Sequence, residues 1–279
     1  MRPFLHSVSG LAAAAALMLP GTPAIAQPAP PPAGPTYADL ADMADSASLV
    51  VHVQMRSATR LKNERAPGLR PGWARYYVKA KTRALLTAAA PVGEVLRYLV
   101  DVPLGPQGKP PKLGKQEVLL FARPAPRPGE IQLVAADAQV GWTPERDMTV
   151  RTLLQDLLAP GAPGRVSGIR EVIHVPGTLA GEGETQMFLA TRDSSAASIT
   201  VRHGARGRSE WGASFSELVA DLGNPPREGT VAWYRLACFL PDRLPAQANL
   251  SETASARAQA ERDYRMVLGD LGPCPRTRS

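Results

Sequence analysis

Leu49-Val50-Val51-His52-Val53-Gln54-Met55 alternates between an apolar face and a mixed face. Successive side chains of a β-strand point to opposite faces, so this stretch predicts a half-buried strand. Four further runs of strand type follow it and are separated by segments rich in Gly, Pro and Lys: 76–86, 94–102, 117–122 and 130–135. Five strands in about 90 residues predict a small closed or nearly closed barrel.

Helical patterns flank these strands. Thr36 offers an N-cap for a short helix over 37–46, with Asp39 three residues further on. Asp147 or Thr149 could begin a second helix, in which apolar residues recur with helical spacing from Val150 to Leu158. The Pro- and Gly-rich segment 160–164 then predicts a boundary after a basic barrel-like domain at 36–159.

The chain beyond this boundary, 165–279, predicts a second small domain. Strands are expected at 169–175, 185–191, 198–202 and 231–240. A capping box at Ser214 and Glu217 predicts a helix that ends near Leu222, and 250–271 predicts a long last helix. The expected fold class is therefore α+β and mainly β, with a five-stranded barrel followed by a second β domain with helices.

The first 26 residues have the pattern of a secretory signal peptide. Arg2 supplies a charge, 11–19 is an uncharged apolar run too short to cross a bilayer, and Ala24-Ile25-Ala26 is a small-residue cleavage site. Residues 27–35 are rich in proline and predict a spacer. We therefore expect a mature protein that is periplasmic or secreted, with no transmembrane segment after cleavage.

The sequence has two cysteines, Cys238 and Cys274. An exported chain passes through an oxidising space in which two thiols usually pair, so a disulfide that fastens the last helix to the strand at 231–240 is expected. The alternative is a reactive thiol, although neither cysteine belongs to a CxxC pair and Cys238 lies in an apolar run.

The formal net charge of +7 is unevenly distributed. Residues 56–127 carry 15 Lys or Arg against 4 acidic residues, and Trp73 lies among them. Such a field attracts polyanions, although arginine-rich solvated loops without a function would give the same composition. The expected contact residues are Arg56, Arg60, Lys62, Arg65, Arg70, Trp73, Arg75, Lys109, Lys112 and Lys115.

Two segments resemble known proteins. The pattern from Leu40 to Val51, with Val118-Leu-Leu-Phe-Ala122 and the strand that ends at Gln132-Leu-Val134, resembles exported bacterial domains with an OB or netrin-like barrel. It departs from them because no helical segment separates the third and fourth strands. The second half, with His174-Val-Pro-Gly and Trp233-Tyr-Arg-Leu, is similar to uncharacterised secreted proteins of alphaproteobacteria. The first resemblance implies a binding role, and the second implies export.

No motif for catalysis or metal binding emerges from the sequence. His52, His174 and His203 lie in separate strand-like segments without paired spacing, so no metal site and no cofactor are expected. The sequence also lacks a Gly-x-Ser-x-Gly turn, and Glu182 and Glu184 lie in a Gly-rich turn.

Two hypotheses of function remain. The first is a non-enzymatic, exported binding or envelope-associated protein whose loop 57–74 contacts an anionic partner such as phosphorylated lipid, acidic glycan or acidic protein; nucleic acid is unlikely in that compartment. The second is a hydrolase with a site at the domain junction, built from His174, Glu182, Glu184 and Asp193.

Overall fold

A computed structural model describes residues 34–89, 91–204, 207–217 and 223–278. The predicted signal peptide, 1–26, and most of the predicted spacer lie outside the described residues, so both stay predictions. In the part of the chain that is described, no helix is long and apolar enough to cross a membrane.

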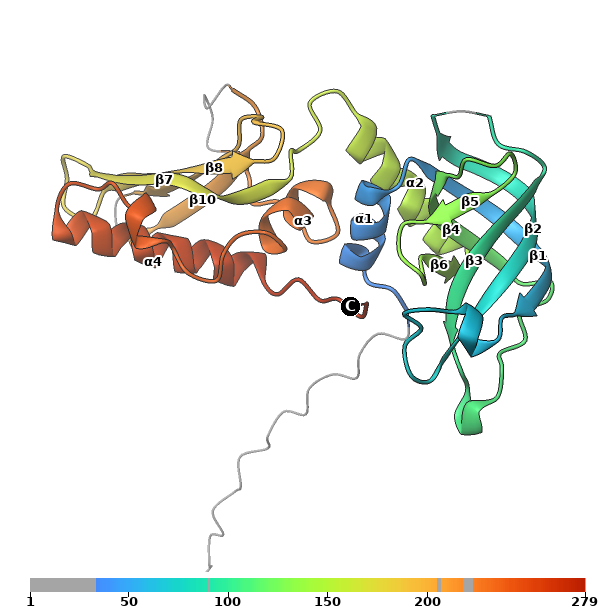
Figure 1. The fold of residues 1–279 in the computed structure, drawn as a ribbon. Helices are drawn as coiled ribbons and strands as arrows, with labels where there is room; N and C mark the ends of the chain where they lie inside the picture. Colours follow the sequence, from blue (N-terminus) through green and yellow to red (C-terminus); the bar gives the residue numbers. More distant parts are fainter. Residues whose placement is uncertain (1–33, 90, 205–206, 218–222, 279) are drawn as a thin grey trace, which may run out of the picture. The chain divides into compact units, whose positions relative to one another are not determined.

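The described chain forms two antiparallel sheets and four α-helices (Figure 1). The first part contains α1 (Tyr37–Ser46), β1 (Leu49–Arg60), β2 (Trp73–Ala88), β3 (Val95–Pro103), β4 (Glu117–Pro124), β5 (Ile131–Leu133), β6 (Gln139–Gly141) and α2 (Pro144–Leu158). The second part contains β7 (Val166–Pro176), β8 (Gly183–Thr191), β9 (Ser198–His203), β10 (Ser209–Ser214), α3 (Val231–Ala237) and α4 (Ala254–Leu271). The mainly β character expected from the sequence is confirmed.

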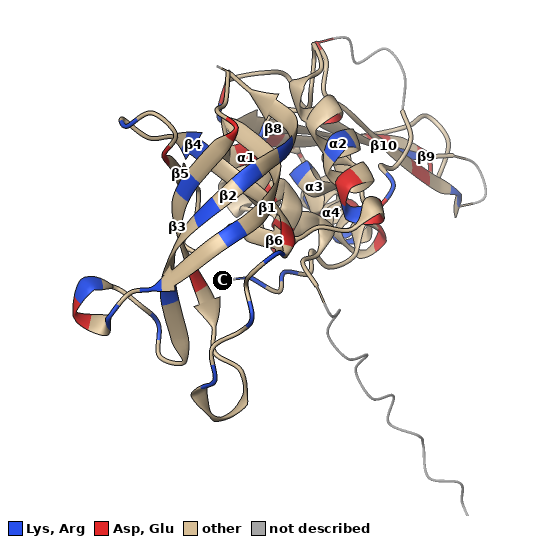
Figure 2. Cartoon of the chain, turned by 90° about the vertical axis from the view of Figure 1, so that its right-hand side faces the viewer, with Lys and Arg blue, Asp and Glu red and all other residues tan. Residues whose placement is uncertain are grey.

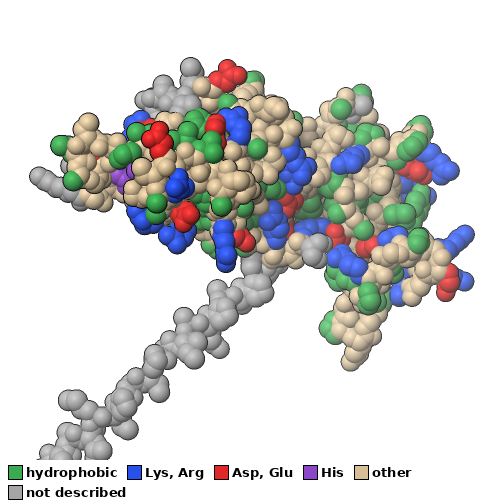
Figure 3. All heavy atoms as spheres, turned by 60° about the vertical axis from the view of Figure 1, so that its left-hand side comes forward, with side chains coloured by type: hydrophobic (Ala, Val, Ile, Leu, Met, Phe, Trp, Pro, Cys, Tyr) green, Lys and Arg blue, Asp and Glu red, His purple; other side chains and the backbone are tan. Residues whose placement is uncertain are grey.

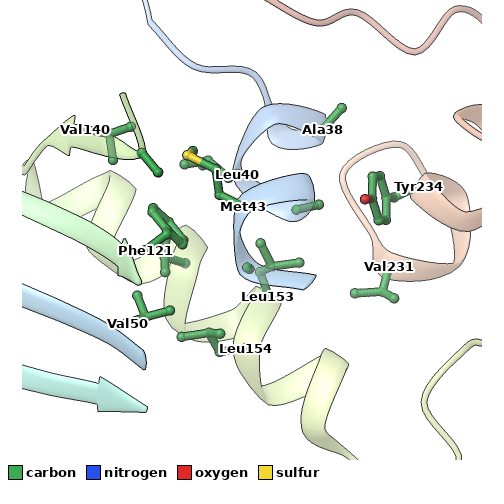
Figure 4. Close-up of a cluster of buried hydrophobic side chains, with 14 of the residues drawn as sticks. Ala38, Leu40, Met43, Val50, Phe121, Val140, Leu153, Leu154, Val231 and Tyr234 are labelled. Carbon is green, nitrogen blue, oxygen red and sulfur yellow. The ribbon is translucent and has the colours of Figure 1, made fainter. Parts of the chain in front are cut away.

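The first sheet has the strand order β3-β2-β1-β4-β5, and β6 also pairs with β4. Each of the five predicted strands forms, and the residues of the opening stretch pair on both sides, with β2 and with β4. Val50, on the face expected to be mixed, is fully buried as well, because side chains of α1 and α2 cover that face (Figure 4). The first five residues of β1 are therefore buried on both faces, and the prediction of a half-buried strand was wrong there. The short strand β6 was not predicted.

Of the two alternatives that the sequence left open, a closed or a nearly closed barrel, the closed one was wrong. The five strands form an open sheet, and its two end strands, β3 and β5, meet through a single parallel bridge between Arg97 and Glu130. The cause is the length of β5, which has three residues between the turn at Arg127–Gly129 and the turn that follows Val134. A strand of this length cannot form a continuous ladder with the nine-residue β3.

Apolar side chains from α1 and α2 pack against this sheet (Figure 4). Leu40 and Met43 of α1 lie with Phe121 of β4, and Leu153 and Leu154 come from α2. Thr36 caps α1 as predicted and also forms a capping box with Asp39, and Thr143, not Asp147 or Thr149, caps α2. Phe121 is fully buried, so Phe121→Ala would lower the free energy of unfolding by on the order of 3–5 kcal/mol.

The acidic side of α1 faces α3. Arg235 of α3 makes two hydrogen bonds to the Asp45 carboxylate, at 2.9 and 2.7 Å, and the Tyr234 hydroxyl donates to Asp42 at 2.6 Å. Asp39, the third acid, accepts hydrogen bonds from the backbone of Thr277 and Arg278. These contacts attach α3 and the C-terminal segment to α1.

The second sheet has the order β10-β9-β8-β7, and α4 packs on β7 (Figure 1). The strands expected at 169–175, 185–191 and 198–202 all form. The last helix begins at Ala254, capped by Thr253, instead of at Leu250. Each sheet is formed within one of the two predicted domain ranges, 36–159 and 165–279; the domain boundary itself stays a prediction.

Two secondary-structure predictions in this part were wrong. The strand expected at 231–240 is the helix α3, which begins because the Thr230 side chain accepts a hydrogen bond from the Trp233 backbone. Its β-type residues Val231, Trp233 and Tyr234 are all buried, so packing overrides their strand preference. Ser214 ends strand β10 and does not begin a helix; residues 215–217 are non-helical, and 218–222 lie outside the described residues.

The predicted disulfide joins Cys238 and Cys274, with a Cα–Cα distance of 5.2 Å. Cys238 is the C-cap of α3, so the bond connects α3, and not a strand, to the segment that follows α4. The alternative of a reactive thiol is therefore excluded, since neither cysteine is free.

Candidate functional site

Two histidines and a carboxylate converge on the face of the second sheet that α4 covers. His174 lies on β7, His203 on β9 and Asp263 on α4, and their ligand-type atoms all lie within 4.8 Å of one another. The strand register creates this arrangement because His174 pairs with Thr185 of β8, while His203 pairs with Gly183, two residues away on the same face. The sequence separates these three residues by 29 and 60 positions.

Gly183 leaves the space that the His174 ring occupies. A Cβ at this position would lie 2.9 Å from His174 Cε1 and 2.9 Å from the Val175 carbonyl oxygen. Both distances are closer than van der Waals contact allows, so any side chain here would displace the imidazole. The glycine in the strand is thus explained by the close approach of a neighbouring side chain.

Thr185 connects His174 to Asp263. The Thr185 hydroxyl donates a hydrogen bond to Asp263 Oδ2, and it lies 2.8 Å from His174 Nδ1, from which it can accept a hydrogen bond. His203 Nε2 contacts the same carboxylate at 3.0 Å. Thr185 is fully buried and Asp263 is 2 % exposed. The four groups form one hydrogen-bonded cluster around the Asp263 carboxylate.

Other side chains hold the cluster in place. Gln259, one turn before Asp263 on α4, donates to Asp263 Oδ1 at 2.7 Å and accepts from Arg262. Ser209 Oγ lies 2.9 Å from His203 Nδ1. Burial lowers the pKa of His174; the negative charge of Asp263 opposes this shift, whereas His203 and Arg262 add to it. His174 therefore favours its neutral form.

A hollow of about 270 Å³ opens beside this cluster. His174 and His203 line it together with Glu182 of the β7–β8 loop and Gln259 and Arg262 of α4. Figure 3 shows histidine atoms reaching the surface on the side of the molecule that carries β7 and α4. The histidine cluster is thus close to solvent although Asp263 is buried.

A larger hollow, about 1170 Å³, shares His203 and Glu182 with the first and extends over the other face of the sheet. Glu184, Arg202 and Arg208 line it. Burial alone would raise the pKa of Glu184, but hydrogen bonds from Arg202 and Gln186 hold it below its ordinary value. Glu184 is therefore ionised at neutral pH.

The residues of the hydrolase hypothesis do not all come together. His174, Glu182 and Glu184 surround the two hollows, but Asp193 hydrogen-bonds Ser195 in the turn after β8. That turn lies at the opposite end of β8, on the order of 20 Å along the strand from Thr185. Thr185, Gln259 and Asp263, which were not singled out in the sequence, are the residues that contact the two histidines.

His52, the remaining histidine of the predicted mature chain, lies in the first sheet. It contacts Glu117 at 3.2 Å and stacks on Trp142, with ring centroids 4.7 Å apart. His52 is buried on a central strand, whereas the sequence favoured a half-buried or edge histidine.

The predicted basic contact residues divide into two groups. Arg75 is ion-paired with Asp101, Arg70 is ion-paired with Asp137, and Trp73 lies under the Arg70 guanidinium at 3.7 Å. These three residues therefore have structural partners. The other seven are exposed, and in the described part of the chain no ion pair joins any of them to a carboxylate: Arg56, Arg60, Lys62, Arg65, Lys109, Lys112 and Lys115.

The seven unpaired cations lie at one end of the first sheet, because β1 ends there, β2 begins, β3 ends and β4 begins. Backbone hydrogen bonds join the neighbouring segments, from Leu104 to Gly72 at 2.8 Å and from Lys115 to Met55 at 3.0 Å. Figure 2 shows the Lys and Arg residues along β2 and in the loops at this end. Two basic clusters that are separate in the sequence thus become neighbours.

No family model matches the chain, and no curated protein matches it in sequence. The observations that bear on function are therefore the histidine cluster and the exposed cations of the first sheet.

Proposed function

We propose that this protein is an exported, non-enzymatic binding protein whose basic loops contact an anionic partner. The contact surface consists of the loops 61–72 and 104–116 with the adjoining end of β1, and we call it the basic end of the sheet. The observation that carries the proposal is the position of seven exposed, unpaired cations on these neighbouring segments.

The surface is almost free of opposing charge. Glu64 is the one acidic residue in 56–72, and the segment 104–116 has none. The electrostatic potentials of cations that have no carboxylate partner in their own chain add where the cations lie within a Debye length, about 10 Å at 0.1 M ionic strength. Arg70 and Arg75 support the loop, since Arg75 also donates to the Pro67 carbonyl at 3.2 Å. A supported loop holds its charges in place with less loss of entropy on binding.

The strand order supports a finer inference about the fold. The order β3-β2-β1-β4-β5, with a parallel bridge from β3 to the start of β5, is compatible with an open form of the OB topology suggested by the sequence resemblance. Domains of that type mostly bind other molecules, but a fold alone carries no function, and the proposal rests on the charges.

Binding to anionic vesicles at rising salt tests the proposal. The mature chain is mixed with phosphatidylcholine vesicles that contain or lack phosphatidylglycerol, and in parallel with an acidic polysaccharide resin. We expect binding to one anionic surface, with release as salt increases, because the Debye length falls to about 3 Å at 1 M. Absence of binding at low salt, or retention that ignores salt, would refute the proposal.

A matched pair of variants localises the contact. The variant K109E/K112E/K115E reverses three charges at the basic end, and R192E/R227E/R243E makes the same change at exposed residues elsewhere. Each Lys or Arg near an anionic membrane contributes about 1 kcal/mol to binding. The first variant removes three such contributions, so it should bind at least about a hundredfold more weakly. Equal loss in both variants would show that only net charge matters.

A further inference from the structure

The cluster of His174, His203 and Asp263 has the composition of a metal centre. Two imidazoles and one carboxylate are ligands that Zn²⁺ and similar divalent transition ions bind. His203 Nε2 lies 3.0 Å and His174 Nδ1 lies 3.9 Å from an Asp263 oxygen. Ligand atoms that each lie about 2.0–2.2 Å from a tetrahedral zinc ion are roughly 3.3 Å apart, so the cluster needs little rearrangement.

The Asp263 carboxylate is buried and would be stabilised by a nearby cation. Asp263 is 2 % exposed, and among the described residues neither Lys nor Arg forms an ion pair with it. Its partners are the Thr185 hydroxyl, the Gln259 amide and the histidines. Burying a carboxylate without a compensating charge is unfavourable, and metal coordination is one way in which proteins meet this requirement.

The groups around the three residues are those that orient metal ligands. Ser209 Oγ can accept a hydrogen bond from the Nδ1–H group of His203. His203 Nε2, which faces Asp263 and lies 3.3 Å from the Gln259 amide nitrogen, is then the unprotonated nitrogen that can bind an ion. Gln259 fixes Asp263, and Arg262 fixes Gln259. Metal-binding histidines usually donate their second ring nitrogen to an oxygen in this way.

From this geometry we infer that His174, His203 and Asp263 bind a divalent transition-metal ion, with zinc as the best fit to two nitrogen ligands and one oxygen ligand. Thr185 Oγ1 lies between His174 Nδ1 and Asp263, so it either completes the ligand set or moves aside for the ion. The hollow beside the histidines gives an ion a path from solvent and leaves a coordination position for water. This inference is independent of the basic end of the sheet.

Zinc binding to the mature, metal-stripped protein tests the inference directly. Isothermal titration should give one zinc ion per chain, and Co²⁺ should give the visible absorption bands of a nitrogen- and oxygen-ligated ion. H174A and H203A should each weaken zinc binding by about a hundredfold or more, and S209A by about tenfold, since it removes an orienting partner.

His52→Ala is the matched control, because His52 belongs to the first sheet and contacts Glu117. It should leave zinc affinity unchanged. Far-ultraviolet circular dichroism checks that each variant folds. D263N is a third variant, and if it fails to fold, H174A and H203A still decide the test. If the wild type binds no zinc, or if H174A and H203A bind it as the wild type does, the cluster is a metal-free hydrogen-bonded network and the inference is wrong.

Discussion

Arg75 on β2 forms a two-point ion pair with Asp101, which lies directly opposite on β3. The guanidinium donates from Nε to Oδ1 at 2.6 Å and from Nη2 to Oδ2 at 2.8 Å. Hydrogen bonds to Asp101 raise the pKa of Arg75, and the carboxylate is 4 % exposed. A residue that appeared in the sequence to belong to a basic binding surface therefore fastens two strands together.

Arg75→Ala should destabilise the protein by about 3 kcal/mol, because it leaves the buried Asp101 charge without a partner. Urea unfolding followed by tryptophan fluorescence measures this change. Lys62→Ala removes an exposed, unpaired cation from the neighbouring loop and should change stability by less than about 0.5 kcal/mol. Equal effects of the two substitutions would contradict the structural role of Arg75.

The sequence predicted β1–β5 and β7–β9, because alternation and turn residues are local signals, but it missed the strands β6 and β10. It failed at Val231–Ala237, where Thr230 caps a helix and burial accommodates β-type residues. It also failed at the closure of the barrel, since the length of β5 depends on the turns on either side of it. The Thr230 cap was a local signal that the strand prediction missed, whereas the burial of Val231 to Tyr234 and the missing ladder between β3 and β5 depend on residues far apart in the sequence.

The histidine cluster could not be found from spacing for the same reason. His174 and His203 face each other because β8 lies between β7 and β9 in one particular register, and Asp263 reaches them from a helix 60 residues further on. A one-residue change of register would place either histidine on the opposite face. Gly183 gave no local sign of the close approach, because the sequence placed it in the Gly-rich turn before the strand expected at 185–191, whereas it belongs to β8.

The Cys238–Cys274 bond should stabilise the second part of the chain. The double variant C238S/C274S is expected to lose up to about 4 kcal/mol, because the bond closes a loop of roughly 37 residues in the unfolded chain. Hydrogen exchange should increase first in α4 and α3, while β1–β4 stay protected. Titration of the unfolded, unreduced wild type should detect no thiol; two thiols per chain would contradict the bond.

Asp39 should make the protein sensitive to acid. Burial alone would raise its pKa, but hydrogen bonds from Thr277 and Thr36 hold the pKa below the ordinary value. A carboxyl group whose pKa is depressed on folding adds stability above its unfolded pKa of about 3.9, and this stability is lost as the pH falls through the folded value. Comparing the free energies of unfolding of wild type and D39N should show a gap at neutral pH that closes in acid.

Asp156→Asn is the control for this measurement, since Asp156 is exposed on α2. Its free energy of unfolding should follow that of the wild type throughout the titration. A D39N gap that stays constant into acid would show that the carboxylate charge is not what attaches the C-terminal segment to α1.

Gly183→Ala should disturb the histidine cluster by steric contact alone. The new Cβ would lie 2.9 Å from both His174 Cε1 and the Val175 carbonyl oxygen, so the ring must move and the protein should lose about 1–3 kcal/mol. Gly168→Ala in β7 is the matched control, because its Cβ meets no atom within 4 Å and the change should be neutral or slightly stabilising. Thermal unfolding compares the two variants, with zinc titration as a second measurement. Only G183A should lose both stability and zinc affinity; if the two glycine variants behave alike, the His174 ring does not depend on the space at position 183.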